Sequence, residues 1–419
     1  MQKKTIRDIT LTGKKVIMRV DFNVPLTESL TIADDTRIKA ALPSINYILE
    51  HGASLILMSH LGRPKGKGYQ AEFSLKPVAE YLGKLLNRDI AFCPDCQQAD
   101  AAARALAPGQ ILMLENTRFY QAEEGKAKKT EEMSEEEYAA KKAELKAQKA
   151  AMAEKLASYA EVYVNDAFGT AHRDHASTAS ICKYMRKKGG PCVAGFLMQK
   201  ELEYLGLAMS NPKRPFVAII GGAKVSGKLE VLQSLMQKVD TILIGGGMAY
   251  TFLRAMGHEI GNSLCETELL ETAKDTLAQA KAAGVKFLLP CDNRIADKFA
   301  NDANIKICGN DIPAGWSALD IGPETAKVYS AEIKTAQTIV WNGPMGCFEM
   351  SNFAAGTNAI CQAVADSKAI SIVGGGDSVS AVNQSGLADK ITHISTGGGA
   401  SLEFLEGKDL PGCSALDDK

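Results

Sequence analysis

Short runs of β-branched and aliphatic residues recur along this chain, and each run ends in a glycine, a polar residue or a charge. The runs are KVIMRVDFNVP, ASLILMSHLGRP, QILMLENTRF, EVYVNDAFGTAHR, PFVAIIGGAK, TILIGGGMA, KFLLPCDN, TIVWNGPMG, AISIVGGGDS and ITHISTGGGAS. Their apolar residues are mostly continuous rather than alternating, and segments with helical spacing separate the runs. This pattern is typical of a parallel β-sheet that is buried on both faces. The sequence therefore predicts an α/β fold.

The length of the chain indicates more than one domain, because 419 residues exceed what a single hydrophobic core usually holds. We interpret the first four runs and the last six as separate sheets, which gives two doubly wound, Rossmann-like domains joined by a hinge helix. A segment with helical apolar spacing, ended by Pro212 and Pro215, separates them. The expected divisions are a first domain at 1–195, a connecting helix and hinge at 196–215, a second domain at 216–404, and a tail at 405–419 that packs back on the first domain.

The charge balance disfavours several classes of partner. Lys and Arg number 48 against 49 Asp and Glu, for a net charge of −1, so no basic excess is available to hold a nucleic acid by counterion release. No apolar run approaches the roughly 18 residues of a membrane span, and the first residues lack the apolar core of a signal peptide. We expect a cytoplasmic enzyme with neither a nucleic-acid nor a membrane partner.

Cationic and polar side chains gather at the ends of the strands predicted in the first half. They are Arg19, Asp21, Asn23, Arg37, His60, Arg63, Arg118, His172, Arg173 and His175. Guanidinium groups that converge on one rim suit the oxygens of phosphate and carboxylate, so the pattern predicts a small phosphorylated acid as ligand. His172 and His175 also have a spacing that zinc ligands use, but without a partner Cys pair a structural or anion-contact role is favoured.

Glycine-rich turns follow the strands predicted in the second half, in GGAKVSGK, GGGMAY, NGPMG, GGGDS and TGGGAS. Several such turns at the mouth of one parallel sheet suggest a backbone that approaches a polyphosphate, with helix N-termini donating amides. GGAKVSGKL resembles a Walker A loop until its last position, where Leu229 replaces the Ser or Thr that would hold magnesium. We expect Asp377, at a predicted helix start, to take over the metal, and Lys224 and Lys228 to neutralise phosphate charge.

Taken in order, RVDFNVP, SHLGRP, LENTRF, VNDAFGTAHR, GGAKVSGK, WNGPMGCFE, GGGDS and STGGGASLEFLEGK resemble the phosphoglycerate kinase family over nearly the whole chain. The resemblance implies reversible Mg²⁺-dependent phosphoryl transfer between 1,3-bisphosphoglycerate and ADP, giving 3-phosphoglycerate and ATP, in glycolysis or gluconeogenesis. It also implies closure of a cleft that aligns the substrates, and a monomer.

The resemblance further assigns site residues. The acid substrate is expected at Asp21, Phe22, Asn23, Arg37, His60, Leu61, Gly62, Arg63, Arg118 and Arg173. The nucleotide is expected at Lys228, Ala318, Asn342, Glu349, Gly374, Gly375, Gly376, Asp377 and Ser378, with Glu349 on the ribose and Asp377 on the metal. The catalytic residues are expected to be Arg37, Lys224 and Gly376, with Arg37 and Lys224 flanking the phosphoryl group in transit.

The chain departs from the family pattern at three places. Asp174 stands where the family usually has Ala, and an acid beside Arg173 is expected to compete for its guanidinium group. Ala318 stands where Gly is common, which is tolerable if the nucleotide contact is through the backbone. A charged segment near 124–150 is longer than in most relatives.

The charged segment is predicted to form a helix, because Ser134 and Glu137 have the spacing of a capping box. Tyr138, Leu145 and Met152 recur every seven residues and form a thin apolar seam. A solvated helix packed along one edge is favoured over a partner-binding coiled-coil arm.

Three other functions fit the residues less well than that of the phosphoglycerate kinase family. A P-loop nucleotidase requires Ser or Thr after Lys228, and a nicotinamide dehydrogenase requires a G-x-G-x-x-G spacing that the glycine clusters lack. A non-catalytic scaffold with the same fold is disfavoured because Arg37, Lys224, Lys228 and Asp377 are all present.

Overall fold

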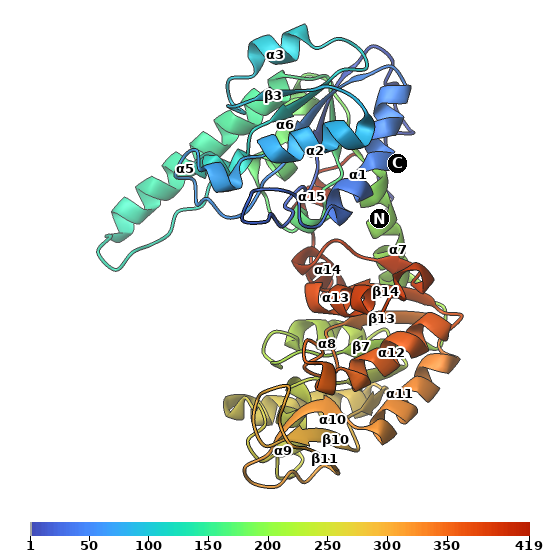
Figure 1. Ribbon diagram of the computed structural model, residues 1–419. Coiled ribbons are helices and arrows are strands. Elements are labelled where there is room, and N and C mark those ends of the chain that lie inside the picture. The colour runs from blue at the N-terminus through green and yellow to red at the C-terminus, as the bar shows by residue number, and fades with distance from the viewer. Residues whose placement is uncertain (1) are drawn as a thin grey trace. The chain divides into compact units, whose positions relative to one another are not determined.

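The apolar runs of the sequence form the strands of two parallel sheets in the computed structural model, which describes residues 2–419 (Figure 1). Tertiary contacts divide the chain into two units. Unit 1 contains the residues up to Leu202 together with Asp409–Lys419, and unit 2 contains Glu203–Lys408. The division falls inside helix α7, Phe196–Ser210.

Unit 1 is built on a six-stranded sheet in which every neighbouring pair of strands is parallel, in the order β3-β4-β2-β1-β5-β6. Its strands are β1 Lys15–Arg19, β2 Ser54–Met58, β3 Ile90–Cys93, β4 Ile111–Leu114, β5 Val162–Asn165 and β6 Cys192–Ala194. Its helices are α1 Thr36–Glu50, α2 Lys76–Leu86, α3 Asp100–Ala105, α4 Gln121–Glu124, α5 Glu135–Ser158, α6 Ile181–Lys187, the first part of α7, and α15 Pro411–Ser414.

Three of the four central strands of unit 1 are buried along their whole length, as continuous apolar runs predict. Every residue of β2, β4 and β5 is buried. Side chains of β1 and β2 pack with Ile38 and Ile45 of α1 in one core cluster. Burial of each such aliphatic side chain contributes about 1.5–3 kcal/mol, so this core fixes the sheet whose carboxyl edge carries the polar motifs.

Unit 2 contains a second six-stranded parallel sheet, in the order β15-β14-β13-β7-β8-β9. Its strands are β7 Phe216–Ile220, β8 Thr241–Ile244, β9 Lys286–Leu288, β13 Thr338–Asn342, β14 Ile370–Gly374 and β15 His393–Ile394. Its helices are the rest of α7, α8 Leu229–Met236, α9 Met248–Ala255, α10 Leu270–Ala282, α11 Pro323–Thr335, α12 Ala355–Asp366, α13 Gly376–Gln384 and α14 Gly399–Leu405. The strand order reverses between β7 and β13, which lie side by side.

A small antiparallel sheet also belongs to unit 2 and was not anticipated from the sequence. Its order is β11-β10-β12, with β10 Asn293–Ala296, β11 Ile305–Cys308 and β12 Ser317–Ile321. The edge strands β3 and β6 of unit 1 were likewise not anticipated. The α/β class with two doubly wound parallel sheets is confirmed.

Helix α5 is the charged segment of the sequence, and it runs along one side of unit 1 (Figure 1). The predicted capping box is present, because the Ser134 side chain accepts from the backbone of Glu137 and the Glu137 side chain accepts from the backbone of Ser134. Leu145 and Met152 are buried, whereas the first two turns of the helix are largely exposed. The second half of α5 is therefore part of the core of unit 1.

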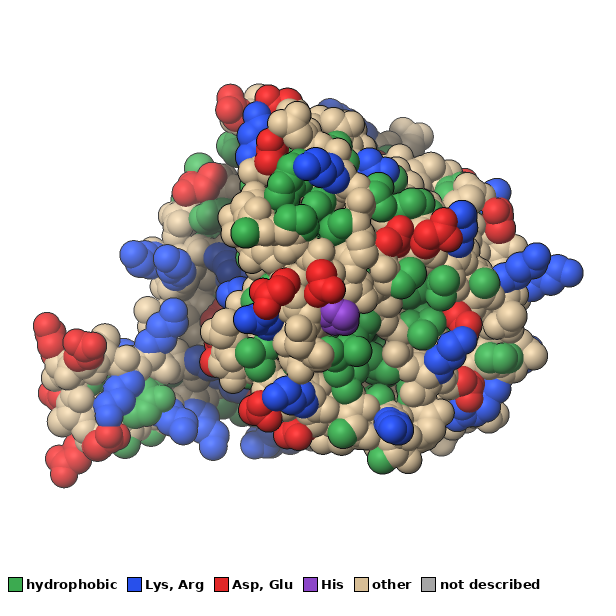
Figure 2. Space-filling view, turned by 90° about the horizontal axis from the view of Figure 1, so that it is seen from below, with side chains coloured by type: hydrophobic (Ala, Val, Ile, Leu, Met, Phe, Trp, Pro, Cys, Tyr) green, Lys and Arg blue, Asp and Glu red, His purple; other side chains and the backbone are tan. Residues whose placement is uncertain are grey.

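Figure 2 shows one face of the molecule, on which Lys and Arg side chains are interspersed with Asp and Glu. Within residues 2–419, no helix is both long enough and apolar enough to cross a membrane.

Candidate active site

Loops that follow the strands of unit 1 form a connected polar rim at the carboxyl edge of its sheet. Arg37, in the first turn of α1, places its Nη1 atom 3.3 Å from Oδ2 of Asp21 and donates to the carbonyl of Asn23 at 2.9 Å. The side-chain Oδ1 of Asn23 accepts from the Gly62 amide at 2.8 Å. The Gly62 carbonyl in turn accepts from Nη1 of Arg118 at 3.3 Å. Residues after β1, β2 and β4 are thus linked into one site.

Two of the expected acid-binding residues, Phe22 and Leu61, lie beneath this rim with buried side chains. The Phe22 amide donates to Oγ of Ser59 at 2.9 Å, and the Leu61 carbonyl accepts from Nδ2 of Asn116 at 2.7 Å. Their contribution is to hold the loops in place through the backbone. Arg63, beside Gly62, is exposed.

A buried network behind the rim includes Glu123, a residue that sequence reasoning missed. Arg19 is fully buried, donates from Nε to Oγ of Ser177 at 2.8 Å, and places Nη2 3.1 Å from Nδ1 of His60. The Ser177 amide donates to Oε2 of Glu123 at 3.1 Å, and Glu123 is also fully buried. Glu123 lies in a run of mostly polar residues, QAEEGK, which is typical of an exposed segment. Only the structure reveals that Glu123 is buried and linked to Arg19 through Ser177.

At three histidines of unit 1, burial first and nearby positive charges second lower the pKa of the imidazole. The pKa of His172 is lowered to about 4 by its partial burial and then by the charges of Arg173 and Arg118. The pKa of His175 is lowered to about 2 by burial and then by Arg118 and Arg19. Burial likewise lowers the pKa of His60 well below its usual value, with Arg19 as the next cause. All three imidazoles are therefore neutral at pH 7.

Several buried polar atoms of unit 1 have no hydrogen-bond partner among the described residues. They include Oδ1 of Asp21, Nε of Arg118, Nδ1 of His172 and Nδ1 of His175. Such atoms cost about 1–3 kcal/mol each when they stay unpaired, so a ligand or ordered water at this edge of the sheet is indicated. The surrounding cations favour an anion. Within residues 2–419, no three His, Cys, Asp or Glu side chains are grouped so that they could hold a metal ion.

Unit 2 has a pocket of about 350 Å³ at the carboxyl ends of β7, β13 and β14. Its lining residues are Gly221, Gly222, Ala223, Lys224, Lys228, Asn342, Gly343, Gly375, Gly376, Asp377, Ser378, Gly398, Gly399 and Leu402. The pocket lies where the strand order reverses, the position at which open α/β sheets bind ligands. Four of the five glycine clusters expected to approach a polyphosphate thus meet at one place, and they include Gly398 and Gly399, which had no assigned role. The fifth cluster, GGGMAY, contributes no lining residue.

Hydrogen bonds tie the strand ends of this pocket together. Lys228, immediately before α8, donates from Nζ to Oδ1 of Asn342. The Asn342 side chain donates to the Gly374 carbonyl at 3.1 Å, and the Gly343 amide donates to Oγ of Ser378 at 2.5 Å. Burial lowers the pKa of Lys228, while the negative charge of Asp377 opposes that shift. An ammonium, a carboxylate and the N-terminus of α13 therefore share one cavity.

Three of the expected nucleotide residues lie outside the lining of this pocket. Gly374 is the last residue of β14, directly before the lining residue Gly375. Ala318 is a buried residue of β12, and its amide donates to Oγ of Ser263 at 2.9 Å. Glu349 is exposed in the segment between β13 and α12.

The expectation that Asp174 competes for the guanidinium group of Arg173 is wrong. Oδ2 of Asp174 accepts from Nζ of Lys149 at 2.7 Å, and Oδ1 accepts from Oγ of Ser180 at 2.8 Å. Nε of Arg173 instead donates to Nε2 of His172 at 3.1 Å.

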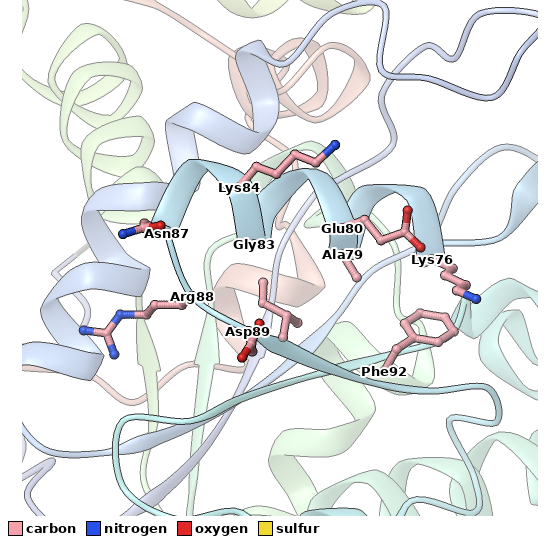
Figure 3. Close-up of a pocket in the computed structure, with 10 residues that line it drawn as sticks. Lys76, Ala79, Glu80, Gly83, Lys84, Asn87, Arg88, Asp89 and Phe92 are labelled. Carbon is pink, nitrogen blue, oxygen red and sulfur yellow. The ribbon is translucent and has the colours of Figure 1, made fainter.

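A larger groove of about 640 Å³, between α2 and β3, does not have the character of a binding site. Its cationic side chains, Lys76, Lys84 and Arg88, point in different directions rather than toward one another (Figure 3). A site for an anion requires such groups to converge.

Comparison with known proteins decides the family, since the model of the phosphoglycerate kinase family matches residues 6–408. The chain belongs to the phosphoglycerate kinase family. The phosphoglycerate kinases of Herpetosiphon aurantiacus and Koribacter versatilis are 53% and 56% identical to it, each over 100% of both chains. The structure of phosphoglycerate kinase from Coxiella burnetii superposes with a TM-score of 0.86 at 39% identity. The structure from Pyrococcus horikoshii superposes with a TM-score of 0.77 at 31% identity, and both structural matches cover 99% of this chain and 98% of the other.

Phosphoglycerate kinases transfer a phosphoryl group reversibly between 1,3-bisphosphoglycerate and ADP, which gives 3-phosphoglycerate and ATP in glycolysis. The chain is therefore a phosphotransferase that acts on small molecules and uses a carboxyl group as acceptor. The ATP-dependent reaction of phosphoglycerate kinases needs a divalent metal ion. The family and reaction inferred from the ordered motifs are confirmed, and the alternatives of a P-loop nucleotidase and a dehydrogenase are set aside.

Proposed function

We propose that unit 1 binds the acid substrate and unit 2 binds the nucleotide. Support for the acid site comes from the rim of Asp21, Asn23, Arg37 and Arg118, in which cations and unpaired polar atoms converge. Planar guanidinium groups bind phosphate and carboxylate oxygens in a bidentate way, so this rim suits 3-phosphoglycerate, which carries both. His60, Gly62, Arg63 and Arg173 complete the proposed site, and Phe22 and Leu61 hold its loops.

Support for the nucleotide site comes from one observation above all, the convergence of Lys228, Asp377 and the N-terminus of α13 in the glycine-lined pocket. Amides at a helix N-terminus bind phosphate oxygens, and the helix dipole adds to the attraction. Gly374, Gly375 and Ser378 shape this turn, and Asn342 holds Lys228 against it. Glu349 is proposed to contact the ribose, and Ala318 to contact the nucleotide through its backbone.

We propose that the divalent metal is Mg²⁺ and that Asp377 is its protein ligand. Magnesium usually binds one or two carboxylates, substrate phosphates and several waters, and Asp377 supplies one carboxylate beside the proposed phosphate position. When bound, such an ion neutralises phosphate charge.

The chain's own residues need no nucleophile for this reaction, because the carboxylate of the acid substrate attacks the phosphoryl group. The transition state for phosphoryl transfer is loose, so catalysis consists largely of alignment and charge neutralisation. Arg37 and Lys224 are proposed to flank the group in transit, and the Gly376 amide is proposed to donate to it. Transfer also requires the two bound substrates to meet in the absence of water, and we propose that segment 196–215 acts as the hinge.

A coupled assay with 3-phosphoglycerate and MgATP tests these roles. Arg37→Ala is expected to lower kcat about 100-fold or more, in the range found when a transition-state donor is removed, with an unchanged Kd for MgATP. Arg88→Ala, an exposed arginine of unit 1, is the matched control and should behave as wild type. Equal losses in kcat and in nucleotide affinity would show that Arg37 is only structural. We also propose that the enzyme is a cytoplasmic monomer. Light scattering measures the mass in solution and so tests whether the enzyme is a monomer.

A further inference from the structure

Asp174 places a carboxylate directly after Arg173, a residue of the proposed acid site. A free negative charge there would weaken the attraction of the rim for an anion, because charges that close interact strongly near a protein surface. The carboxylate is not free. Nζ of Lys149 lies 2.7 Å from Oδ2 of Asp174 and also donates to its backbone carbonyl at 3.0 Å, while Ser180 donates to Oδ1 at 2.8 Å.

Lys149 reaches Asp174 from α5, the charged helix (Figure 1). Its side chain is only 16% exposed, although it carries a charge. Its stem packs against Gly125, where an added Cβ would lie 2.8 Å from Cβ of Lys149. The contact is made at the end of α4, whose Glu124 lies 3.8 Å from Nε of Arg118. Lys149 therefore sits between the loop that bears Arg173 and the helix next to Arg118.

Hydrogen bonds to the backbone couple the 172–175 loop to the contact between Lys149 and Asp174. The Arg173 carbonyl accepts from the His175 amide at 3.0 Å and from Oγ1 of Thr178 at 2.8 Å. A shift of the Asp174 carbonyl, which Lys149 holds, therefore moves the residues on both sides of it.

We propose that Lys149 is a positioning residue for the acid-substrate site, which cancels the charge of Asp174 and holds the loop that carries Arg173. This inference rests on the proposed role of unit 1 in binding the acid. It assigns the charged helix α5, through Lys149, a part in substrate recognition.

The inference predicts a specific pattern in a double-mutant cycle. Lys149→Ala leaves a negative charge beside Arg173, so KM for 3-phosphoglycerate should rise about three- to fivefold, the upper range for a partly exposed ion pair. KM for MgATP should not change. Asp174→Ala in the Lys149→Ala background should return KM for 3-phosphoglycerate close to the wild-type value, because the unpaired carboxylate of Asp174 is removed. Lys149→Arg, which keeps the charge, should retain most of the affinity.

Lys155 provides the matched control on the same helix. It forms an ion pair with Asp100, at 2.7 Å, and no site residue takes part in that pair. Lys155→Ala should leave both KM values unchanged, and circular dichroism should show that every variant is folded. An equal rise in both KM values for Lys149→Ala, or no recovery in the double variant, would overturn the inference. Absence of turnover in the wild-type enzyme would instead contradict the proposed function.

Discussion

Glycine residues serve two different purposes in the pocket of unit 2 that we propose binds the nucleotide. Gly221 and Gly343 let two strand ends meet, since a Cβ on Gly221 would lie 2.0 Å from the carbonyl oxygen of Pro344 and one on Gly343 would lie 2.1 Å from that of Gly221. Gly376 is different, because a Cβ there would meet nothing within 4 Å and its φ is not positive. Packing within the protein does not require glycine at 376, so we attribute it to the close approach of a ligand.

Gly376→Ala is therefore predicted to fold normally and to bind nucleotide poorly. The free energy of unfolding should stay within about 0.5 kcal/mol of wild type or rise slightly, because alanine is favoured over glycine in a helix. The Kd for MgADP, measured by calorimetry, should rise about tenfold, which corresponds to about 1.4 kcal/mol. Gly309→Ala, at another open position of unit 2, is the control. Loss of stability without loss of affinity would place Gly376 among the structural glycines.

His172 offers a direct measurement of the potential at the acid site. Its pKa is lowered to about 4 by partial burial and then by Arg173 and Arg118, so a bound anion, which favours the imidazolium form, must raise it. By linkage, the anion must bind more tightly as the pH falls from 7 toward 4. We predict that sulfate raises the pKa read from the imidazole NMR signal, and that Arg173→Gln raises it without sulfate. A pKa that does not respond to sulfate would indicate that the anion binds elsewhere.

Individual residues were predictable from sequence when a strand end fixed their position. Asn342 ends a buried strand, Lys228 directly precedes α8, and Asp377 lies in the first turn of α13, so the geometry of the parallel sheet brings them together. Asp174 was mispredicted because its partner, Lys149, comes from a helix that is distant from it in the sequence. Local sequence does not show which of several nearby cations a carboxylate will meet.

Whole elements were also predictable only when their own residues carry a clear signal. Buried parallel strands such as β2, with five buried residues in five, have a continuous apolar signal. Strand β3 lies at a sheet edge and has an exposed residue, and β11 has two, so neither shows that signal. Strand β6 is only three residues long. Edge and antiparallel strands need little apolar surface, so their hydrogen-bond partners define them more than their composition does.

Helix α5 has an exposed first part and a buried second part. Gly125 lies against the stem of Lys149 and close to the Leu145 carbonyl, so the chain on either side of the tip is already in contact. Replacing residues 127–142 by a short Gly/Ser linker with a serine cap is predicted to leave kcat and both KM values within about twofold, as for exposed surface in general.

A longer deletion, of 126–149, tests the other half of this prediction. It removes buried Leu145 together with Lys149, so the free energy of unfolding should fall by about 2–5 kcal/mol. KM for 3-phosphoglycerate should rise as well. If urea denaturation and steady-state kinetics found the two deletions equally harmless, α5 would not belong to the core of unit 1.

On the scale of the whole molecule, the two units differ in how the chain forms them. Unit 2 is one continuous stretch, whereas unit 1 is completed by residues 409–419. Leu410, Cys413 and Leu416 of this tail are buried, and the Gly412 amide donates to the Ala171 carbonyl at 2.7 Å. Ala171 directly precedes His172 and Arg173, so the tail supports a loop of the proposed acid site.

Truncation after Lys408 is predicted to damage unit 1 alone. Each lost apolar side chain costs about 1.5–3 kcal/mol, so unit 1 should unfold at a lower temperature than in the full chain. The truncated protein should still bind MgADP with wild-type affinity, because the pocket of unit 2 is intact. Calorimetry measures both quantities, and a parallel loss of nucleotide affinity would refute the independence of the units.

The position of residues 409–419 also sets an order of maturation. During synthesis these residues leave the ribosome only after the whole of unit 2 has been made, although unit 2 does not need them. The nascent enzyme is thus expected to become able to bind the adenine nucleotide first and the three-carbon acid last.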